Sequence, residues 1–336
     1  MTQIGLFDEQ NRLEKLSKLG DSLEQLEKIV DFKIFEPLLN EVIPRIDNGK
    51  GGRPPYPNLL MFKILLVKRL FQLSYDETEY QINDRISFMR FLGLTISDKV
   101  PDSKTIWFYE DILSNNESGK SLFDIFNNEL EKEGYITKEG AIIDATFIEA
   151  PRRKNTKEQR EEIKNGEVPE EWTETPQQLM QRDLDATWTV KSNEVHFGYK
   201  DNVKIDETTK FITDYTVTTA STNDAKGADA LIDENDKVLY ADAAYANMVI
   251  PDSVENMISQ KANRNHPLTD EQRKNNQAKA KVRCRIEHVF GNMAKAIGGT
   301  FIRCKNILRA TFEISLLNLL YNIRRTFTIN RLRAAG

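Results

Sequence analysis

Histidine and cysteine are scarce in this sequence of 336 residues, which holds 3 His and 2 Cys. Cys284 and Cys304 form no Cys-x-x-Cys pair, and two cysteines do not make a disulfide framework. Three histidines without matching spacing do not support a zinc site of His and Cys ligands. The composition therefore favours a cytosolic protein with free thiols.

Long apolar runs are also missing. The most apolar stretch, residues 59–71, is interrupted by Lys63, Lys68 and Arg69, so it is too short and too charged to span a bilayer. The first residues show no basic segment followed by an apolar one, and we therefore expect no signal peptide. These absences predict a cytoplasmic protein without a membrane partner.

Acidic residues are rare in one part of the chain, although the net charge is −5. Residues 261–336 contain 16 Lys or Arg against 4 Asp or Glu, a net charge of +12, so the remaining residues carry −17. This asymmetry favours a face that binds a polyanion. The alternative is a solvated basic helix face without such a partner.

The hydrophobic pattern divides the chain into three parts. Up to about residue 125 the pattern is helical, with leucines at positions 13, 16, 19, 23 and 26. Ser74 and Glu77 have the spacing of a helix capping box. Short helices joined by tight turns predict a helix-turn-helix-like bundle for DNA binding or dimerisation. A purely structural bundle is the alternative.

The second part changes to strands, and the third returns to helix. Apolar or alternating segments predict strands at 141–148, 195–200, 211–219, 237–242 and 257–259. A charged segment at 150–192 interrupts them, and we expect it to be a partly helical excursion rather than part of the sheet. Helices are expected at 277–295 and 312–323. The order predicts an α/β fold behind a helical N-terminal domain.

Three acids occupy positions where a carboxylate is costly. Asp144 follows three apolar residues in a strand, Asp242 ends a buried strand, and Glu287 lies beside Ile286 and Val289 on a helix. Buried carboxylates need a partner, a proton or a metal. Such acids suit hard divalent cations in phosphoryl transfer. The alternatives are a helix cap for Asp242, a salt bridge for Glu287 and a turn contact for Asp144.

Several short motifs occur in order along the chain. They are G-R-P-P-Y-P-N-L-L-M-F-K at 52–63, D-A-T-F-I-E-A-P at 144–151, H-F-G-Y-K at 196–200, T-A-S-T-N-D at 219–224, Y-A-D-A-A-Y at 240–245 and R-C-R-I-E-H-V-F-G at 283–291. Together they resemble transposases of bacterial insertion sequences, in particular the insertion sequence five family of the DDE group. The similarity covers about residues 25–325.

The resemblance implies a ribonuclease H-like core with a mixed five-stranded sheet flanked by helices. It implies a helical domain at 1–125, a catalytic domain at 137–329 and an insert at 150–192. Asp144, Asp242 and Glu287 would be the catalytic, metal-binding triad for two Mg²⁺ ions, with Mn²⁺ as a substitute. The partner would be double-stranded DNA, both the terminal inverted repeats and the target, in a bacterial, nucleoid-associated setting.

The helix motif departs from the related signature in two places. That signature has Tyr, two residues, Arg, three residues, Glu, six residues and Lys; Arg283 and Glu287 match it, whereas Ala280 and Ala294 replace the Tyr and the Lys. Arg283, one helical turn before Glu287, is a candidate to hold the glutamate or a phosphate. Lys281 and Lys295 are candidate substitutes.

Further DNA contacts are predicted from residue type. His196 and Lys200 share a strand face with Gly198, and Lys104 and Arg303 are additional candidates. The alternative for the strand residues is an ordinary sheet face. For Trp172 and Trp188 we expect buried packing rather than stacking on a base. Trp107 is expected in the core, and the Asn223-Asp224 pair is expected to cap a helix.

These features predict an enzyme that cleaves DNA at element ends and joins the freed 3′-OH to a target. Two ends must meet, so a homodimer on DNA is expected, with the leucine-rich first helix as one candidate contact. One alternative is a nuclease or resolvase of the same fold that cuts without joining. Another is a DNA-binding regulator, or a transposase relative that has lost activity.

Overall fold

The computed structural model describes residues 8–44, 54–152, 156–175, 177, 181–191, 193–262 and 267–335. The chain forms two compact units, Met1–Glu129 with Ser315–Gly336 and Leu130–Ile314. The expected domains follow chain order, whereas these units place the C-terminal segment with the helical part. Among the helices described, none is long and apolar enough to cross a membrane.

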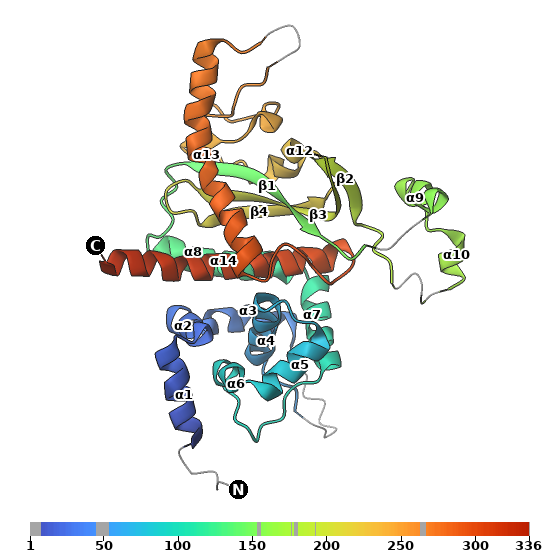
Figure 1. Ribbon diagram of the computed structural model, residues 1–336, viewed down its shortest axis with the longest axis vertical. Coiled ribbons are helices and arrows are strands. Elements are labelled where there is room, and N and C mark those ends of the chain that lie inside the picture. The colour runs from blue at the N-terminus through green and yellow to red at the C-terminus, as the bar shows by residue number, and fades with distance from the viewer. Residues whose placement is uncertain are drawn as a thin grey trace. The chain divides into compact units, whose positions relative to one another are not determined.

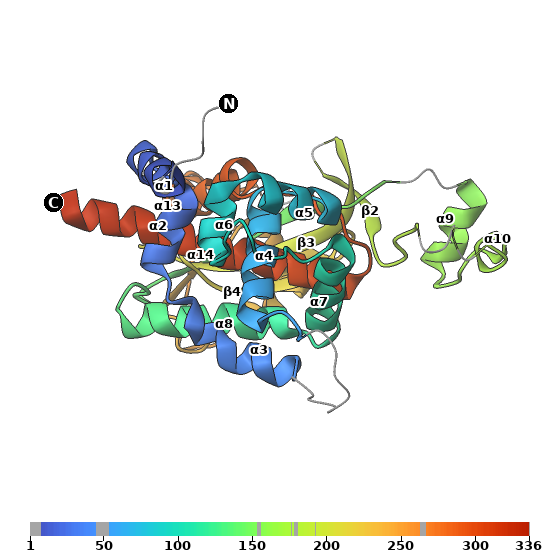
Figure 2. The same cartoon turned by 90° about the horizontal axis from the view of Figure 1, so that it is seen from below.

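The first unit, called the helical unit here, is built from short helices. They are α1 (Asp8–Leu19), α2 (Ser22–Ile29), the 3-10 turn η1 (Phe32–Phe35), α3 (Glu36–Val42), α4 (Asn58–Leu70), α5 (Tyr75–Asp84), α6 (Ile86–Leu92), α7 (Ser103–Asn115) and most of α8 (Ser118–Lys132). The apolar helix α4 is central because α3, α5, α6 and α7 all pack against it (Figure 2). The end of α14 (Ile307–Ala335) completes this unit.

Local signals in the helical unit act as their spacing predicts. The Ser74 hydroxyl accepts a hydrogen bond from Glu77 N at 3.2 Å, and the Glu77 carboxylate accepts one from Ser74 N at 2.7 Å. The predicted capping box is therefore confirmed at the start of α5. In the interior, Lys68 of α4 pairs with Glu110 of α7 at 2.8 Å, and both side chains are buried. Residues 52 and 53 of the proline-rich motif lie outside the described residues.

The second unit, called the sheet unit here, contains a six-stranded mixed sheet. Its strands are β1 (Ala141–Glu149), β2 (Thr187–Lys191), β3 (Glu194–Asp206), β4 (Ile212–Thr219), β5 (Val238–Tyr240) and β6 (Glu255–Asn256). One edge of β3 pairs with β1, and the other edge pairs with β2 and then β4, all antiparallel. On the far side of β1, β5 and β6 follow in parallel. The spatial order is therefore β4-β3-β1-β5-β6, with β2 beside the first part of β3.

Two strand predictions are wrong in detail. Residues 187–191 belong to the segment expected to stay out of the sheet, but they pair with β3 as β2. The last strand lies at 255–256, not at 257–259. The described remainder of the insert contains the helices α9 (Lys157–Lys164) and α10 (Glu170–Thr173). Residues 153–155, 176, 178–180 and 192 of the insert lie outside the described residues.

Helices pack on this sheet as its apolar positions require. The short helix α12 (Asp224–Ala228), with the 3-10 turn η2 (Asp229–Leu231), packs against β1, β3 and β4 (Figure 1). Gly227 permits this approach, because a Cβ there would lie 2.9 Å from the Asn202 side chain. The long helix α13 (Asp270–Ala296) packs against β1 and β5 and begins with a capping box of Thr269 and Gln272.

Candidate active site

Asp144 is the fourth residue of β1, and Asp242 lies two residues beyond the end of β5, the parallel strand beside it. The β1–β5 register pairs Ala141 with Leu239 and Ile142 with Tyr240. Side chains two residues apart on a strand share a face, so two further steps along each strand bring Asp144 beside Asp242. Asp242 directly precedes the 3-10 turn η3 (Ala243–Tyr245). This register puts the two acids at neighbouring positions on adjacent chain segments.

Asp144 carries a charge that the fold makes costly. Burial raises its pKa from 3.8 to about 6, although the backbone N–H of Ala145 donates to its carboxylate at 2.8 Å and opposes the shift. The charge of Asp242 raises the pKa of Asp144 too, while Arg283 and Lys191 lower it. Asp144, Asp242, Arg283 and Lys191 therefore lie in one electrostatic neighbourhood, in which burial and the charge of Asp242 outweigh the groups that stabilise the carboxylate of Asp144.

Asp242 has a structural task as well. Its Oδ1 accepts a hydrogen bond from Ala244 N at 2.7 Å and caps η3. The helix-cap alternative considered for this residue is thus present in the structure. One oxygen serves the cap, and a carboxylate offers about four lone-pair sites, so the cap is compatible with binding a cation.

Glu287 differs from its expectation. It lies on α13, where Ile286 and Val289 are buried, but its own side chain is exposed. The premise that Glu287 is a buried acid is therefore wrong. Among the described residues, no three His, Cys, Asp or Glu side chains lie close enough to hold a metal ion. Within the expected triad, Asp242 is the acid whose charge acts on Asp144.

Arg283 lies on α13 one helical turn before Glu287. Its charge acts on Asp144, and its Nε is buried without a hydrogen-bond partner among the described residues. A buried guanidinium donor that no protein oxygen accepts is costly. Arg283 therefore has an N–H group available to an anion brought to the acids.

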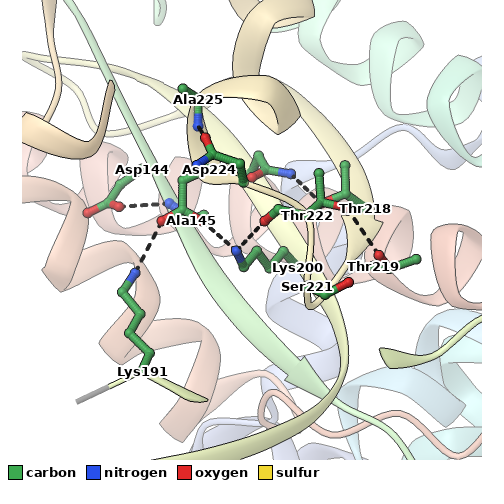
Figure 3. Close-up of polar contacts among 12 residues, drawn as sticks. Asp144, Ala145, Lys191, Lys200, Thr218, Thr219, Ser221, Thr222, Asp224 and Ala225 are labelled. Carbon is green, nitrogen blue, oxygen red and sulfur yellow. Dashed lines mark hydrogen bonds and ion pairs between the residues drawn. The ribbon is translucent and has the colours of Figure 1, made fainter. Parts of the chain in front are cut away.

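A second acidic group lies close by, and its role was not expected. Asn223 caps α12 by accepting from Ala225 N at 3.0 Å, which confirms the capping prediction for that residue. Asp224 instead pairs with two lysines: Lys200 Nζ lies 2.6 Å from its Oδ1, and Lys191 Nζ lies 3.4 Å from its Oδ2 (Figure 3). Lys200 is buried by this contact, so it does not present its ammonium to solvent.

His196 and its neighbours form a stacked, paired group at the end of β1. The imidazole stacks on Phe147 at a centroid distance of 4.0 Å, and its Nδ1 lies 2.8 Å from Glu149 Oε1. Gly198 pairs with Glu149, and a Cβ on Gly198 would lie 2.2 Å from Ile148 O. A side chain at residue 198 would therefore separate β1 from β3.

The other predicted contacts vary in exposure. The side chains of four basic candidates are exposed, namely Lys104, Lys281, Lys295 and Arg303. Trp172 is buried, at 1% exposure, which confirms its packing role. Trp188 and Trp107 are each 42% exposed, so the predictions of buried packing for them are wrong. The sequence could not predict which of these tryptophans is buried, because each has both polar and apolar neighbours.

The strand order and the acid pair together define a class. Three antiparallel strands followed by two parallel ones, with one acid on β1 and one just after β5, form a ribonuclease H-like catalytic core. Residues 136–323 match the family described as Transposase DDE domain, and residues 11–111 match the Transposase domain (DUF772). The first match spans more than half of the chain, which therefore belongs to the DDE transposases.

A solved structure is also similar to this chain. The piggyBac transposase synaptic complex with hairpin DNA aligns with 91% of this chain and 75% of that chain, with a TM-score of 0.49 and 9% sequence identity. The family match identifies the chain as a DNA transposase, a metal-dependent enzyme that acts on DNA. The expected function class and mixed α/β fold are confirmed. Membership of the insertion sequence five family remains a prediction.

Proposed function

We propose that Asp144 and Asp242 bind the divalent cations of this transposase and that Glu287 supplies the third carboxylate. The observation that carries the proposal is that Asp144 of β1 is partly buried beside Asp242, which follows β5, so that burial and the charge of Asp242 both raise the pKa of Asp144. A cation bound between Asp144 and Asp242 would offset the negative charge of the two carboxylates. Mg²⁺ suits such a pair because it binds one or two carboxylates and retains water, and Mn²⁺ is the expected substitute.

Glu287 lies four residues after Arg283, so both residues lie on one side of α13. Its exposed side chain is not held in the core. Three carboxylates would suffice for two ions, which is the number we propose. When bound, such ions activate the attacking oxygen and stabilise the leaving oxygen in phosphoryl transfer.

The protein groups have separate tasks in this reaction. Asp144 and Asp242 act as ionised oxygen ligands. Arg283 donates to a phosphate oxygen with the N–H that has no acceptor among the described residues. Lys281 and Lys295 lie on the same helix as Arg283 and contact the DNA backbone nearby. Lys191, half-exposed and beside Asp224, is a contact that the sequence did not indicate.

We further propose that the DNA substrate is the terminal inverted repeats and the target of an insertion sequence, held mainly by the basic residues 261–336 and the helical unit. Arg303, Lys104, His196 and Lys200 retain their proposed DNA roles, Lys200 after release from Asp224. The catalytic domain would span 137–329 with its insert at 150–192. Binding to repeat DNA should weaken steeply with salt, because phosphate contacts release counterions.

Assembly on DNA is proposed as a homodimer. Joining two element ends in concert needs one active site at each end, which implies at least two subunits. Leu19 of α1 is 75% exposed and is a candidate contact. Light scattering with and without paired-end DNA tests this: a fully active complex of one subunit with one end would contradict it.

The direct test compares Asp144→Asn, Asp242→Asn and Glu287→Gln with Asp252→Asn, which changes an exposed acid away from the site. With labelled terminal DNA and Mg²⁺ or Mn²⁺, we expect cleavage and 3′-end joining to fall to background in the first three variants and to persist in the control. DNA binding should be retained by all four. Cleavage without joining by the wild-type protein would instead indicate a nuclease, and full activity of Asp144→Asn would refute the ligand assignment.

A further inference from the structure

Lys279 of α13 is a buried ammonium group held by one backbone carbonyl. The residue is 7% exposed, and its Nζ donates to Ile258 O at 2.9 Å. Among the described residues, Lys279 forms no ion pair and no further hydrogen bond. Burying a charge without a counter-charge is costly, and an apolar side chain of similar size would avoid this cost. The ammonium therefore needs an explanation other than packing.

The segment 257–260, which accepts this bond, is also attached to the end of β5. Backbone hydrogen bonds between this segment and β5 continue beyond β6, among them the bond from Ser259 N to Ala241 O at 3.0 Å. Ala241 directly precedes Asp242. The segment therefore helps to fix the backbone that carries the Asp242 side chain.

Asn276 attaches α13 to the same segment a second time. Its Nδ2 donates to Gln260 O at 3.0 Å, and its Oδ1 accepts from Gln260 N at 3.0 Å. Asn276 and Lys279 are three residues apart, so they lie on one side of α13. Steps of four along that side lead to Arg283 and then to Glu287. The side of α13 that carries these two residues is thus the side attached to the segment beside Asp242.

The attachment by hydrogen bonds differs from the apolar packing of α13. The helix buries Ile286, Val289 and Met293, and apolar contacts have no preferred direction. A hydrogen bond has a preferred length and angle. The bonds of Lys279 and Asn276 therefore restrict how far α13 can shift along its axis or turn about it.

We propose that Lys279 is a positioning residue, which holds α13 at a fixed distance from Asp242 through the segment 257–260 and so sets where the carboxylate of Glu287 meets the acid pair. The inference rests on the metal site proposed above. Outer groups that orient metal-binding side chains typically contribute about 10- to 100-fold to metal affinity or activity. Lys279 acts through Ile258 O and touches neither the cation nor the DNA.

The test is Lys279→Met in the full-length chain, with Lys237→Met as the matched control. Methionine has a similar length and no donor. Lys237 directly precedes β5, and its side chain is 70% exposed. Mn²⁺ binding is measured by electron paramagnetic resonance of the free ion. We expect Lys279→Met to weaken Mn²⁺ binding about 10-fold with unchanged affinity for DNA, and Lys237→Met to bind both as the wild type does.

Hydrogen exchange in excess EDTA reports the attachment itself. In Lys279→Met the amides of the segment 257–260 should exchange faster than in the wild type, while those of β1 and β3 should not change. Faster exchange throughout the sheet would indicate a general loss of stability and would overturn the positioning role. Unchanged exchange in the segment, or unchanged Mn²⁺ affinity, would overturn it as well.

Asn276→Ala provides a second variant, because it removes the other attachment from a partly exposed position. We expect the same local rise in exchange and the same direction of change in Mn²⁺ binding. This variant keeps the proposal testable if Lys279→Met does not fold. Wild-type exchange and Mn²⁺ binding in Asn276→Ala would contradict a role for the attached segment.

Glu287→Gln separates this inference from the proposed function. If Glu287→Gln loses Mn²⁺ affinity while Lys279→Met and Asn276→Ala keep it, the third ligand stands and the positioning role fails. If Glu287→Gln binds Mn²⁺ as the wild type does, Glu287 is not a ligand, and the inference falls with that assignment.

Discussion

Replacing Asp144 by asparagine should stabilise the metal-free protein while abolishing its activity. Asparagine has nearly the same size and cannot ionise. A carboxyl pKa raised from 3.8 to about 6 corresponds to about 3 kcal/mol of unfavourable free energy for the charged form in the folded state. Asp144→Asn removes this cost, so its free energy of unfolding should exceed that of the wild type by up to about 3 kcal/mol.

The gain must depend on pH in a defined direction. Below about pH 4 the carboxyl group of Asp144 is protonated in both the folded and the unfolded chain, and the variant has little advantage. Between that pH and about 6, the unfolded chain ionises while the folded one does not, so the wild type loses stability as pH rises. Above about 6 the difference between the two proteins is complete.

The assay is urea denaturation in EDTA at pH 4.5, 6 and 8, with Asp252→Asn as the exposed control. Added Mn²⁺ should then stabilise the wild type at pH 8 and leave Asp144→Asn unchanged, because binding to the folded state alone raises stability. An asparagine variant no more stable than the wild type at pH 8, or a gain that is equal at every pH, would refute the reasoning.

Two further predictions concern the frame around the site. Gly198→Ala should destabilise the protein by more than about 2 kcal/mol, because residue 198 has a φ of +147° and the new Cβ would lie 2.2 Å from a backbone oxygen. The control is Gly291→Ala, in open space on α13, which should be neutral or stabilising by about 0.5–1 kcal/mol. Equal melting curves for the two variants would contradict this prediction. Asp206→Asn should lower the free energy of unfolding by about 3 kcal/mol at neutral pH, because it removes a carboxylate that Thr209 and Thr137 stabilise with hydrogen bonds. Burial alone would raise the pKa of Asp206, but these hydrogen bonds outweigh burial and hold the pKa below its usual value. This stabilisation is present above the pKa that Asp206 has in the unfolded chain, and it is lost as pH falls through the lower pKa of the folded protein. The denaturation curves of variant and wild type should therefore converge in acid. A difference in stability that persists at low pH would be inconsistent with this prediction.

The sequence pattern located the strands that carry the site because those strands are apolar and buried. The segments 141–148 and 237–242 each end an apolar run with a carboxylate, and the structure pairs them as β1 and β5. The order of the acids along the chain indicated a possible shared site, and the family resemblance assigned Asp144 and Asp242 to it. The strand β2 was missed because its residues 187–191 are mostly polar or exposed, with Val190 67% exposed.

Side-chain partners from distant positions were beyond the sequence pattern. Lys200 and Asp224 are 24 residues apart, and only the pairing of β3 with β4 and the position of α12 bring them together. Helical periodicity put Glu287 beside buried residues but did not fix which way its own side chain points.

The helical unit is assembled from two distant segments of the chain, and this has a consequence for protein synthesis. That unit takes its last part from residues 315–336, where Leu320 and Ile323 line an apolar gap together with Leu23, Leu26 and Leu66. A ribosome makes the first 129 residues long before this closing segment emerges. The apolar surface of the nascent helices therefore stays uncovered until the sheet unit has been translated. A chain interrupted before residue 315 would lack the segment that closes the helical unit, so truncated products should be poor competitors for the DNA sites of the full-length protein.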